Sequence, residues 1–239
     1  MRKIAIFYHL YQTGEWEKVF SEQFARLEAS GLYSQANHIY VGVTGDKPIS
    51  ISPSPRVKIV RNTDNSSEVP TVRALYEFCA ENSEFNVLNL HATGITWTEQ
   101  HMQNNIVPIA RRPYPVWEIN ENKTLWRKYL EFFTIDKWRE CERLLDFFDC
   151  VGTEWTTHAV LAHKQYYLPH YAGNIWWAKS EYIKTLNWNF IESQPDLRRW
   201  FCECWIGSGN PKYYNFYFSG RNLYLSPIHE SHYNTVEVP

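Results

Sequence analysis

The sequence contains no hydrophobic run of the length that a membrane span needs. Its longest apolar runs, residues 4–8 and 175–178, are far shorter than the roughly 18 consecutive apolar residues of a transmembrane helix. The basic start at residues 1–3 leads into only about five apolar residues, which is too few for a signal peptide. We therefore expect neither a transmembrane helix nor a secretion signal.

The sequence also lacks an excess of charge of either sign. Its 24 lysine and arginine residues stand against 26 aspartate and glutamate residues, which gives a formal net charge of −2. That balance excludes a broad electrostatic surface for nucleic acid or anionic lipid, although a small basic pocket stays open. The five cysteines form no CxxC pair. An odd number of unpaired cysteines is typical of a reducing compartment, so we expect a cytoplasmic protein.

Standard catalytic signatures are missing as well. There is no GxxxxGK[ST] phosphate loop, no GxGxxG, no HExxH and no GxSxG. The lack of any Asp-x-Asp is the most informative absence, because paired aspartates commonly hold a divalent metal against the diphosphate of a sugar nucleotide. Dependence on Mn²⁺ or Mg²⁺ therefore stays open.

Aromatic residues are abundant. They make up 17% of the chain, with 11 tryptophans and 16 tyrosines, while the hydrophobic fraction is an ordinary 44%. Packing of large rings in the core accounts for most of this content. A binding surface is the alternative, because a flat ring suits the C–H face of a sugar or the π-face of a base.

Strand-like and helix-like segments alternate in the first 94 residues. Short apolar runs predict four strands, at 3–8, 38–43, 57–60 and 85–90. Apolar spacing predicts one helix after Trp16 and another after Pro70. This order is typical of a mostly parallel α/β sheet flanked by helices, which binds ligands at the carboxyl ends of its strands.

The remaining residues extend the same pattern. They predict helices at 121–133 and 136–147 joined by a short turn, a buried strand at 150–152, and helical stretches at 179–186 and 195–205. No internal repeat and no linker rich in glycine or serine divides the chain. We therefore expect a single domain over residues 1–239.

The predicted strand ends carry residues that suit a base, a ribose or a diphosphate. They follow the first and fourth strands and comprise His9, Tyr11, Thr13, Gly14, His91, Thr93 and Gly94. A glycine lets a ligand approach backbone amides, and a neutral imidazole binds a metal or a phosphate oxygen. The alternatives are a plain turn at a helix start for Gly14 and a structural histidine for His91.

The densest cluster of polar and aromatic residues lies at 170–177. It offers hydrogen-bond donors, acceptors and flat apolar faces, which a pyranose requires, from His170, Tyr171, Gly173, Asn174, Trp176 and Trp177. The two adjacent tryptophans point to opposite faces of a strand, so at most one is expected to contact sugar. Core packing explains either tryptophan equally well.

Several stretches resemble a family of small bacterial and giant-virus glycosyltransferase-like proteins of the GT-A type. The matches are VLNLHATG at 87–94 to its LYLHTKG strand end, WRKY at 126–129 to its WRxYM helix start, HYAGNIWWA at 170–178 to its HFSGNFWWA motif, and Arg198 to Ile206 to its R…ExWI segment. The resemblance covers about residues 1–206. Ala92 and Thr93 replace the family's threonine and lysine, which removes a charge contact to phosphate from this loop.

The resemblance implies a GT-A-like, Rossmann-like fold with a nucleotide-binding half at 1–94 and an acceptor half with a C-terminal tail at 95–239. It implies that Glu203 lies where such enzymes place the base that takes a proton from the acceptor hydroxyl. His170 is the second catalytic candidate. A solvated helix glutamate is the alternative for Glu203.

Arginines and tail histidines complete the candidates. A diphosphate can be neutralised by arginine instead of a metal, which suits Arg111, Arg112 and Arg127. His229 and His232 stand three residues apart in the tail, where the resemblance implies a loop that closes on the diphosphate or metal. His91 and His229 are therefore the candidate metal ligands. Surface charges and solvated histidines are the alternatives.

These observations favour a glycosyltransferase that moves a sugar from a nucleotide-diphosphate sugar to a glycan acceptor, in surface-polysaccharide or viral glycan synthesis. The alternative is a non-catalytic glycan-binding protein on the same fold, which the missing Asp-x-Asp and the altered HATG loop favour. A glycoside hydrolase is a weaker third hypothesis, because it needs two carboxylates across a cleft and the sequence spacing offers no such pair.

Overall fold

The computed structural model describes residues 2–51, 54–62, 68–93, 116–161, 164–193, 195–223 and 225–233. Its strands are β1 (Lys3–Tyr11), β2 (His38–Thr44), β3 (Val57–Asn62), β4 (Phe85–His91), β5 (Cys150–Gly152), β6 (Trp155–Leu161), β7 (Lys164–Tyr171), β8 (Trp176–Lys179) and β9 (Tyr213–Asn215). Its α-helices are α1 (Trp16–Ala29), α2 (Leu32–Gln35), α3 (Val69–Glu81), α5 (Val116–Glu131), α6 (Trp138–Leu144), α7 (Ser180–Ile183), α8 (Asn189–Glu192) and α9 (Arg198–Cys204).

Seven of the strands form one mixed sheet in the order β3-β2-β1-β4-β8-β5-β9. The four strands β3, β2, β1 and β4 run parallel, whereas β8 is antiparallel to both β4 and β5. The expected α/β class, with a mostly parallel sheet flanked by helices, is confirmed. The four predicted N-terminal strands are also confirmed, each extended by one to three residues at its carboxyl end.

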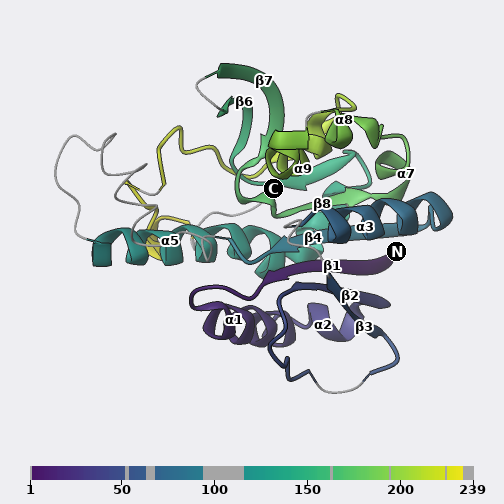
Figure 1. Cartoon of the computed structure of the whole chain (residues 1–239), viewed down its shortest axis with the longest axis horizontal. Helices are drawn as coiled ribbons and strands as arrows, with labels where there is room; N and C mark the ends of the chain where they lie inside the picture. The colour runs from purple at the N-terminus through teal and green to yellow at the C-terminus, as the bar shows by residue number, and fades with distance from the viewer. Residues whose placement is uncertain are drawn as a thin grey trace.

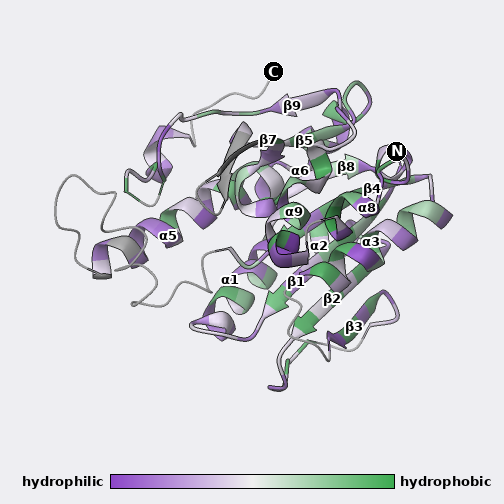
Figure 2. Cartoon of the chain, turned by 45° about the horizontal axis from the view of Figure 1, so that its top comes forward, coloured by the Kyte–Doolittle hydropathy of each residue, from purple (hydrophilic) through white to green (hydrophobic). Residues whose placement is uncertain are grey.

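Helices cover both faces of the sheet, as Figure 1 shows. On one face α1, α2, α5 and α6 pack against Ile4, Ile6, Tyr8 and Leu10 of β1, and on the other α3, α7 and α9 pack against Ala5 and Phe7. Burial on both faces explains why β1 is an almost continuous apolar run instead of an alternating one. Hydrophobic residues accordingly concentrate on the central strands in Figure 2, while α3 alternates between apolar and polar residues.

The order of the strands reverses between β1 and β4. From β1 the chain proceeds to β2 and β3 on one side, and β4 then pairs with the other side of β1. In open α/β sheets such a reversal of strand order is where ligands commonly bind, at the carboxyl ends of the strands. His9 and His91 are direct register partners at this position.

The second half of the chain differs from expectation in two places. The turn predicted between two helices is wrong, because residues Phe132–Asp136 form a π-helical turn between α5 and α6. Thr134, in the middle of this segment, is buried and its carbonyl accepts a hydrogen bond from Trp177 Nε1 at 2.8 Å. The hairpin of β6 and β7 was not predicted, and it forms a separate two-stranded sheet.

Within the ranges given above, no helix is both long enough and apolar enough to cross a membrane.

Candidate functional site

Two histidines face each other where β1 and β4 end. The rings of His9 and His91 stack with their centroids 5.4 Å apart and their planes 13° from parallel. Burial lowers the pKa of His9 well below its ordinary value, and the nearby His91 and Arg199 lower it further. Burial, with a further contribution from Arg199, lowers the pKa of His91 to about 3. Both imidazoles are therefore neutral at pH 7 and act as hydrogen-bonding groups, not as cations.

Glu68 joins His91 to the cluster at 170–177. This residue precedes α3 directly and is only 2% exposed. Its Oε2 atom accepts a hydrogen bond from Asn174 Nδ2 at 2.8 Å and lies 3.6 Å from His91 Nε2. One carboxyl oxygen thus connects the start of α3, the end of β4 and the turn before β8.

Asn174 is held in place by further hydrogen bonds. Its backbone φ is 53°, in the left-handed region that asparagine tolerates better than most residues. Its Oδ1 accepts from Trp176 Nε1 at 2.7 Å, and its carbonyl accepts from Asn89 Nδ2 at 2.9 Å. The side-chain amide therefore has a fixed orientation, with the N–H group aimed at Glu68.

A second carboxyl group, Glu203 of α9, interacts with Glu68. Burial raises the pKa of Glu68 to about 8, and the negative charge of Glu203 contributes to that rise against the opposing effects of Asn174 and Arg199. Burial also raises the pKa of Glu203, and Arg199 opposes the shift. Because the charge of Glu203 acts on Glu68, Glu203 ionises first and Glu68 keeps its proton near neutral pH.

The turn at Ala172–Asn174 depends on a glycine. Gly173 has a φ of +79°, and a Cβ atom there would lie 2.6 Å from Leu130 Cδ1 of α5. Its carbonyl accepts a hydrogen bond from Thr93 Oγ1 at 2.8 Å. The turn is thereby held between the end of β4 and α5, which sets the position of Asn174.

A cavity of about 440 Å³ opens beside this turn, between the loop after β1 and α5. Its lining includes Gly14, Lys18, Thr93, Trp117, Lys123 and Arg127. Burial lowers the pKa of Lys123, while the nearby Glu15 raises it. The cavity combines three basic and two acidic side chains, the latter from Glu15 and Glu121, with an exposed indole and a glycine with a φ of 57°.

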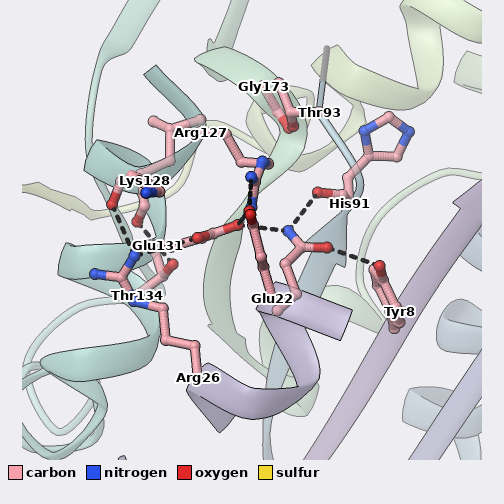
Figure 3. Close-up of polar contacts among 12 residues, drawn as sticks. Tyr8, Glu22, Arg26, His91, Thr93, Arg127, Lys128, Glu131, Thr134 and Gly173 are labelled. Atoms are coloured by element: carbon pink, nitrogen blue, oxygen red, sulfur yellow. Dashed lines mark hydrogen bonds and ion pairs between the residues drawn. The ribbon is translucent and has the colours of Figure 1, made fainter. Parts of the chain in front are cut away.

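Arg127 belongs to a buried ionic network. Its guanidinium pairs with Glu22 of α1 and with Glu131 at 2.9 Å, and Arg26 approaches Glu131 at 3.2 Å (Figure 3). Arg127 lies in the last two turns of α5, not at a helix start as the sequence pattern predicted. Its charge is compensated within the protein, so Arg127 fixes the wall of the cavity. The other basic residues of the lining are Lys18 and Lys123.

The same network reaches the end of β4. Gln23 Nε2 donates to Glu131 at 2.8 Å and to the carbonyl of His91 at 3.3 Å, and Gln23 Oε1 accepts from Tyr8 at 2.7 Å. Figure 3 shows this path from Glu131 to His91 and Tyr8. The backbone that carries His91 is thus tied to α1 and α5.

The structure brings six of the predicted residues together, and two more line the neighbouring cavity. Asn174 and His91 approach the Glu68 carboxyl, Glu203 acts on it through its charge, and His9 stacks on His91, while Thr93 and Gly173 hold the adjacent turn. Gly14 and Arg127 line the cavity. Tyr11 packs partly buried against the core, and Thr13 donates its N–H to the Tyr11 carbonyl in a turn. Gly94, Arg111 and Arg112 lie outside the described residues.

Three aromatic residues of the 170–177 cluster belong to the core. Tyr171, Trp176 and Trp177 are at most 1% exposed, and the two tryptophans pack on opposite faces of the sheet as expected. The Tyr171 hydroxyl donates to the carbonyl of Tyr214 at 2.8 Å. We correct their predicted sugar contact to a packing role, because their rings and polar atoms are all engaged within the protein.

The other histidines predicted from the sequence, His170, His229 and His232, contact other groups. His170 Nδ1 is 2.6 Å from the carbonyl of Leu168 on its own strand, and burial lowers its pKa. His229 and His232 are exposed, with their ring centroids 6.4 Å apart. Among the described residues no group of three or more His, Cys, Asp or Glu side chains could hold a metal ion.

Sequence reasoning missed Glu68 and Arg199. The only local signal of Glu68 is its position before Val69 and Pro70, at a helix start. Arg199 acts on His9, His91 and both carboxyl groups, yet it sits in a charged helix start that resembles a solvated surface. Their importance follows only from their neighbours in the fold.

No protein-family model matches this chain, and no curated protein matches it significantly.

Proposed function

We propose that this protein is a glycosyltransferase that transfers a sugar from a nucleotide-diphosphate sugar to a hydroxyl group of a glycan acceptor. The observation that carries the proposal is the cluster of Glu68, Glu203, His91 and Asn174, together with a charged cavity whose wall includes Thr93, two residues after His91. Paired carboxyl groups near a strand end suit a reaction that moves a proton while an anionic group leaves.

The donor would occupy the 440 Å³ cavity. A glycine with positive φ at Gly14 permits close approach of a phosphate to the backbone, and Lys18 and Lys123 supply positive charge. The exposed Trp117 offers a stacking face for a base.

Glu203 would act as the base. As the acceptor oxygen forms its bond to the anomeric carbon, the bond from that carbon to the diphosphate breaks, and the acceptor proton passes to the ionised carboxylate of Glu203. The leaving diphosphate gains negative charge, which Lys18 and Lys123 stabilise. Glu68, protonated near neutral pH, holds Asn174 and limits the charge of the carboxyl pair.

Thermal unfolding with UDP, GDP, CMP and their sugar conjugates tests donor binding. A ligand at 100 times its dissociation constant stabilises a protein by about 2.7 kcal/mol. Lys123→Met should weaken the effect, whereas Lys128→Met, an exposed lysine on the same helix, should not. If no nucleotide or sugar nucleotide raises the unfolding midpoint of the wild type, the proposal fails.

Release of nucleotide from the bound sugar nucleotide tests the chemistry. We expect Glu203→Gln to lower the transfer rate by about 10²-fold or more while nucleotide binding persists, because general-base catalysis contributes about that much. An unchanged rate would remove Glu203 from the mechanism. Hydrolysis of p-nitrophenyl glycosides in place of transfer would assign the carboxyl pair to a glycoside hydrolase.

A non-catalytic glycan-binding protein is the second candidate. The compensated charge of Arg127 favours it, because the arginine that lines the cavity is already paired with Glu22 and Glu131. Glycan binding without nucleotide binding, and without turnover of any sugar nucleotide, would select this function.

A further inference from the structure

A second cavity has a volume of about 380 Å³, and Ala172 of the turn at Ala172–Asn174 is part of its lining. Trp126 of α5, Glu154, Thr156 of β6, Phe218 and Asn222 also contribute to its wall. Ala172 precedes Gly173, whose carbonyl accepts a hydrogen bond from Thr93 in the wall of the first cavity. The walls of both cavities therefore include residues that belong to this turn or contact it, and Asn174 in the turn contacts Glu68.

The wall of the second cavity is held in a fixed shape by Glu154. This residue has a φ of 58°, and its backbone N–H donates to the carbonyl of Tyr217 while its carbonyl accepts from Ala172. Its carboxylate accepts hydrogen bonds from the Tyr129 hydroxyl at 2.8 Å and from the backbone N–H and hydroxyl of Ser219 at 2.9 and 3.0 Å. These hydrogen bonds connect residues 217–219 through Glu154 to the turn at Ala172–Asn174 in the protein without ligand.

The lining of this cavity suits a neutral sugar. Its described lining residues carry one positive group, Arg221, and one negative group, Glu154, whereas the first cavity is lined by five charged residues, three basic and two acidic. Phe218 is 59% exposed and presents an apolar ring face. Hydroxyl and amide groups of Thr156 and Asn222 lie in the same wall. A ring face with a few polar groups around it is the arrangement that binds a pyranose.

The geometry points to the second cavity as a binding site for a neutral saccharide that stacks on Phe218 and serves as the acceptor. We infer saccharide binding from the lining of the cavity alone, whereas the acceptor role rests on the proposed function.

Saturation-transfer NMR with defined sugars tests the site. The probes are glucose, galactose, mannose, N-acetylglucosamine, lactose and maltose, each added to the wild type, to Phe218→Ala and to Phe147→Ala. Phe147 is 63% exposed and does not line the cavity, so it is the matched control. We expect saturation transfer to at least one sugar with the wild type and with Phe147→Ala. In Phe218→Ala the saturation-transfer signal should fall at least fivefold, and in Phe218→Tyr it should recover. The absence of transfer in the wild type, or equal transfer in Phe218→Ala, would overturn the inference.

Nucleotide titrations of the same proteins separate this inference from the proposed function. Thermal midpoints without ligand verify that each variant is folded. Sugar binding that depends on Phe218, with no response to any nucleotide, would support the saccharide site and reject the transferase and the acceptor role. A nucleotide response that Lys123→Met weakens, with no sugar binding, would retain the donor site and reject the saccharide site.

Discussion

Asn174 and His91 approach the same oxygen atom of Glu68, at 2.8 Å and 3.6 Å. One residue comes from the most distinctive sequence motif and the other from the end of a predicted strand. Their shared partner shows that the end of β4 and the turn before β8 meet at the Glu68 carboxyl, as the glycosyltransferase hypothesis requires.

Glu68 should make the stability of the protein depend on pH above the acid range. Its pKa is about 8 when folded and about 4.5 in its ordinary state, so its stabilising contribution is complete below pH 4.5 and is lost as the pH rises through 8. We expect this contribution to lower the free energy of unfolding as the pH rises from about 6.5, the ordinary pKa of the two buried histidines, to about 8, and the fall to be smaller in Glu68→Gln. Denaturant titrations at each pH measure this, with the exposed Glu81→Gln of the same helix as control. Parallel curves for wild type and Glu68→Gln would contradict the assignment.

His9 and His91 should stay neutral well below pH 6.5. Both have pKa values lowered by burial, to about 3 for His91. Their contribution to stability is therefore present above the ordinary pKa of 6.5 and is lost as the pH falls toward 3. The Cε1 resonances of both rings, followed by NMR, should keep their neutral chemical shifts from pH 8 to pH 5. Titration of either ring near pH 6.5 would show that the stacked pair is solvated.

Gly173→Ala should destabilise the fold. A left-handed backbone costs a residue with a Cβ atom about 1–2 kcal/mol, and overlap with Leu130 adds about 1–3 kcal/mol. Gly31 is the matched control, because its φ of +77° is nearly the same and its nearest neighbour to a Cβ atom lies 3.9 Å away. Chemical denaturation should show the larger loss for Gly173→Ala. Equal losses of unfolding free energy in the two variants would mean that the Leu130 side chain moves away from the added methyl group without cost.

Arg127→Met should cost about 3–5 kcal/mol of unfolding free energy, because it leaves the carboxylate of Glu131 in the core without one of its charged partners. The comparison is Arg73→Met, which breaks an exposed pair with Glu77 at 3.5 Å and should cost less than about 1 kcal/mol. Denaturant midpoints measure both. A small effect of Arg127→Met would show that Arg26 alone compensates Glu131.

Much of the fold could be predicted because it follows from local patterns. The run from Lys3 to Tyr11 is apolar on both faces, which predicts a central strand, and the order of strands and helices in the first 94 residues predicts a parallel sheet. The hairpin at 155–171 was missed because its strands carry mixed polar and apolar residues without clear alternation. The π-helical segment at Phe132–Asp136 was mistaken for a turn because spacing alone does not distinguish a wider helical turn from a break.

The sequence by itself determined the class of the sheet, the position of its strand ends and the presence of a glycine turn before two tryptophans. Only the tertiary structure decided which side chains meet, because Glu68 and Asn174 are 106 residues apart along the chain. It also decided that Arg127 is neutralised and that both tryptophans are buried. The physical reason is that hydropathy and turn preference act over a few neighbouring residues, whereas charge, burial and hydrogen bonding depend on elements that the fold brings together.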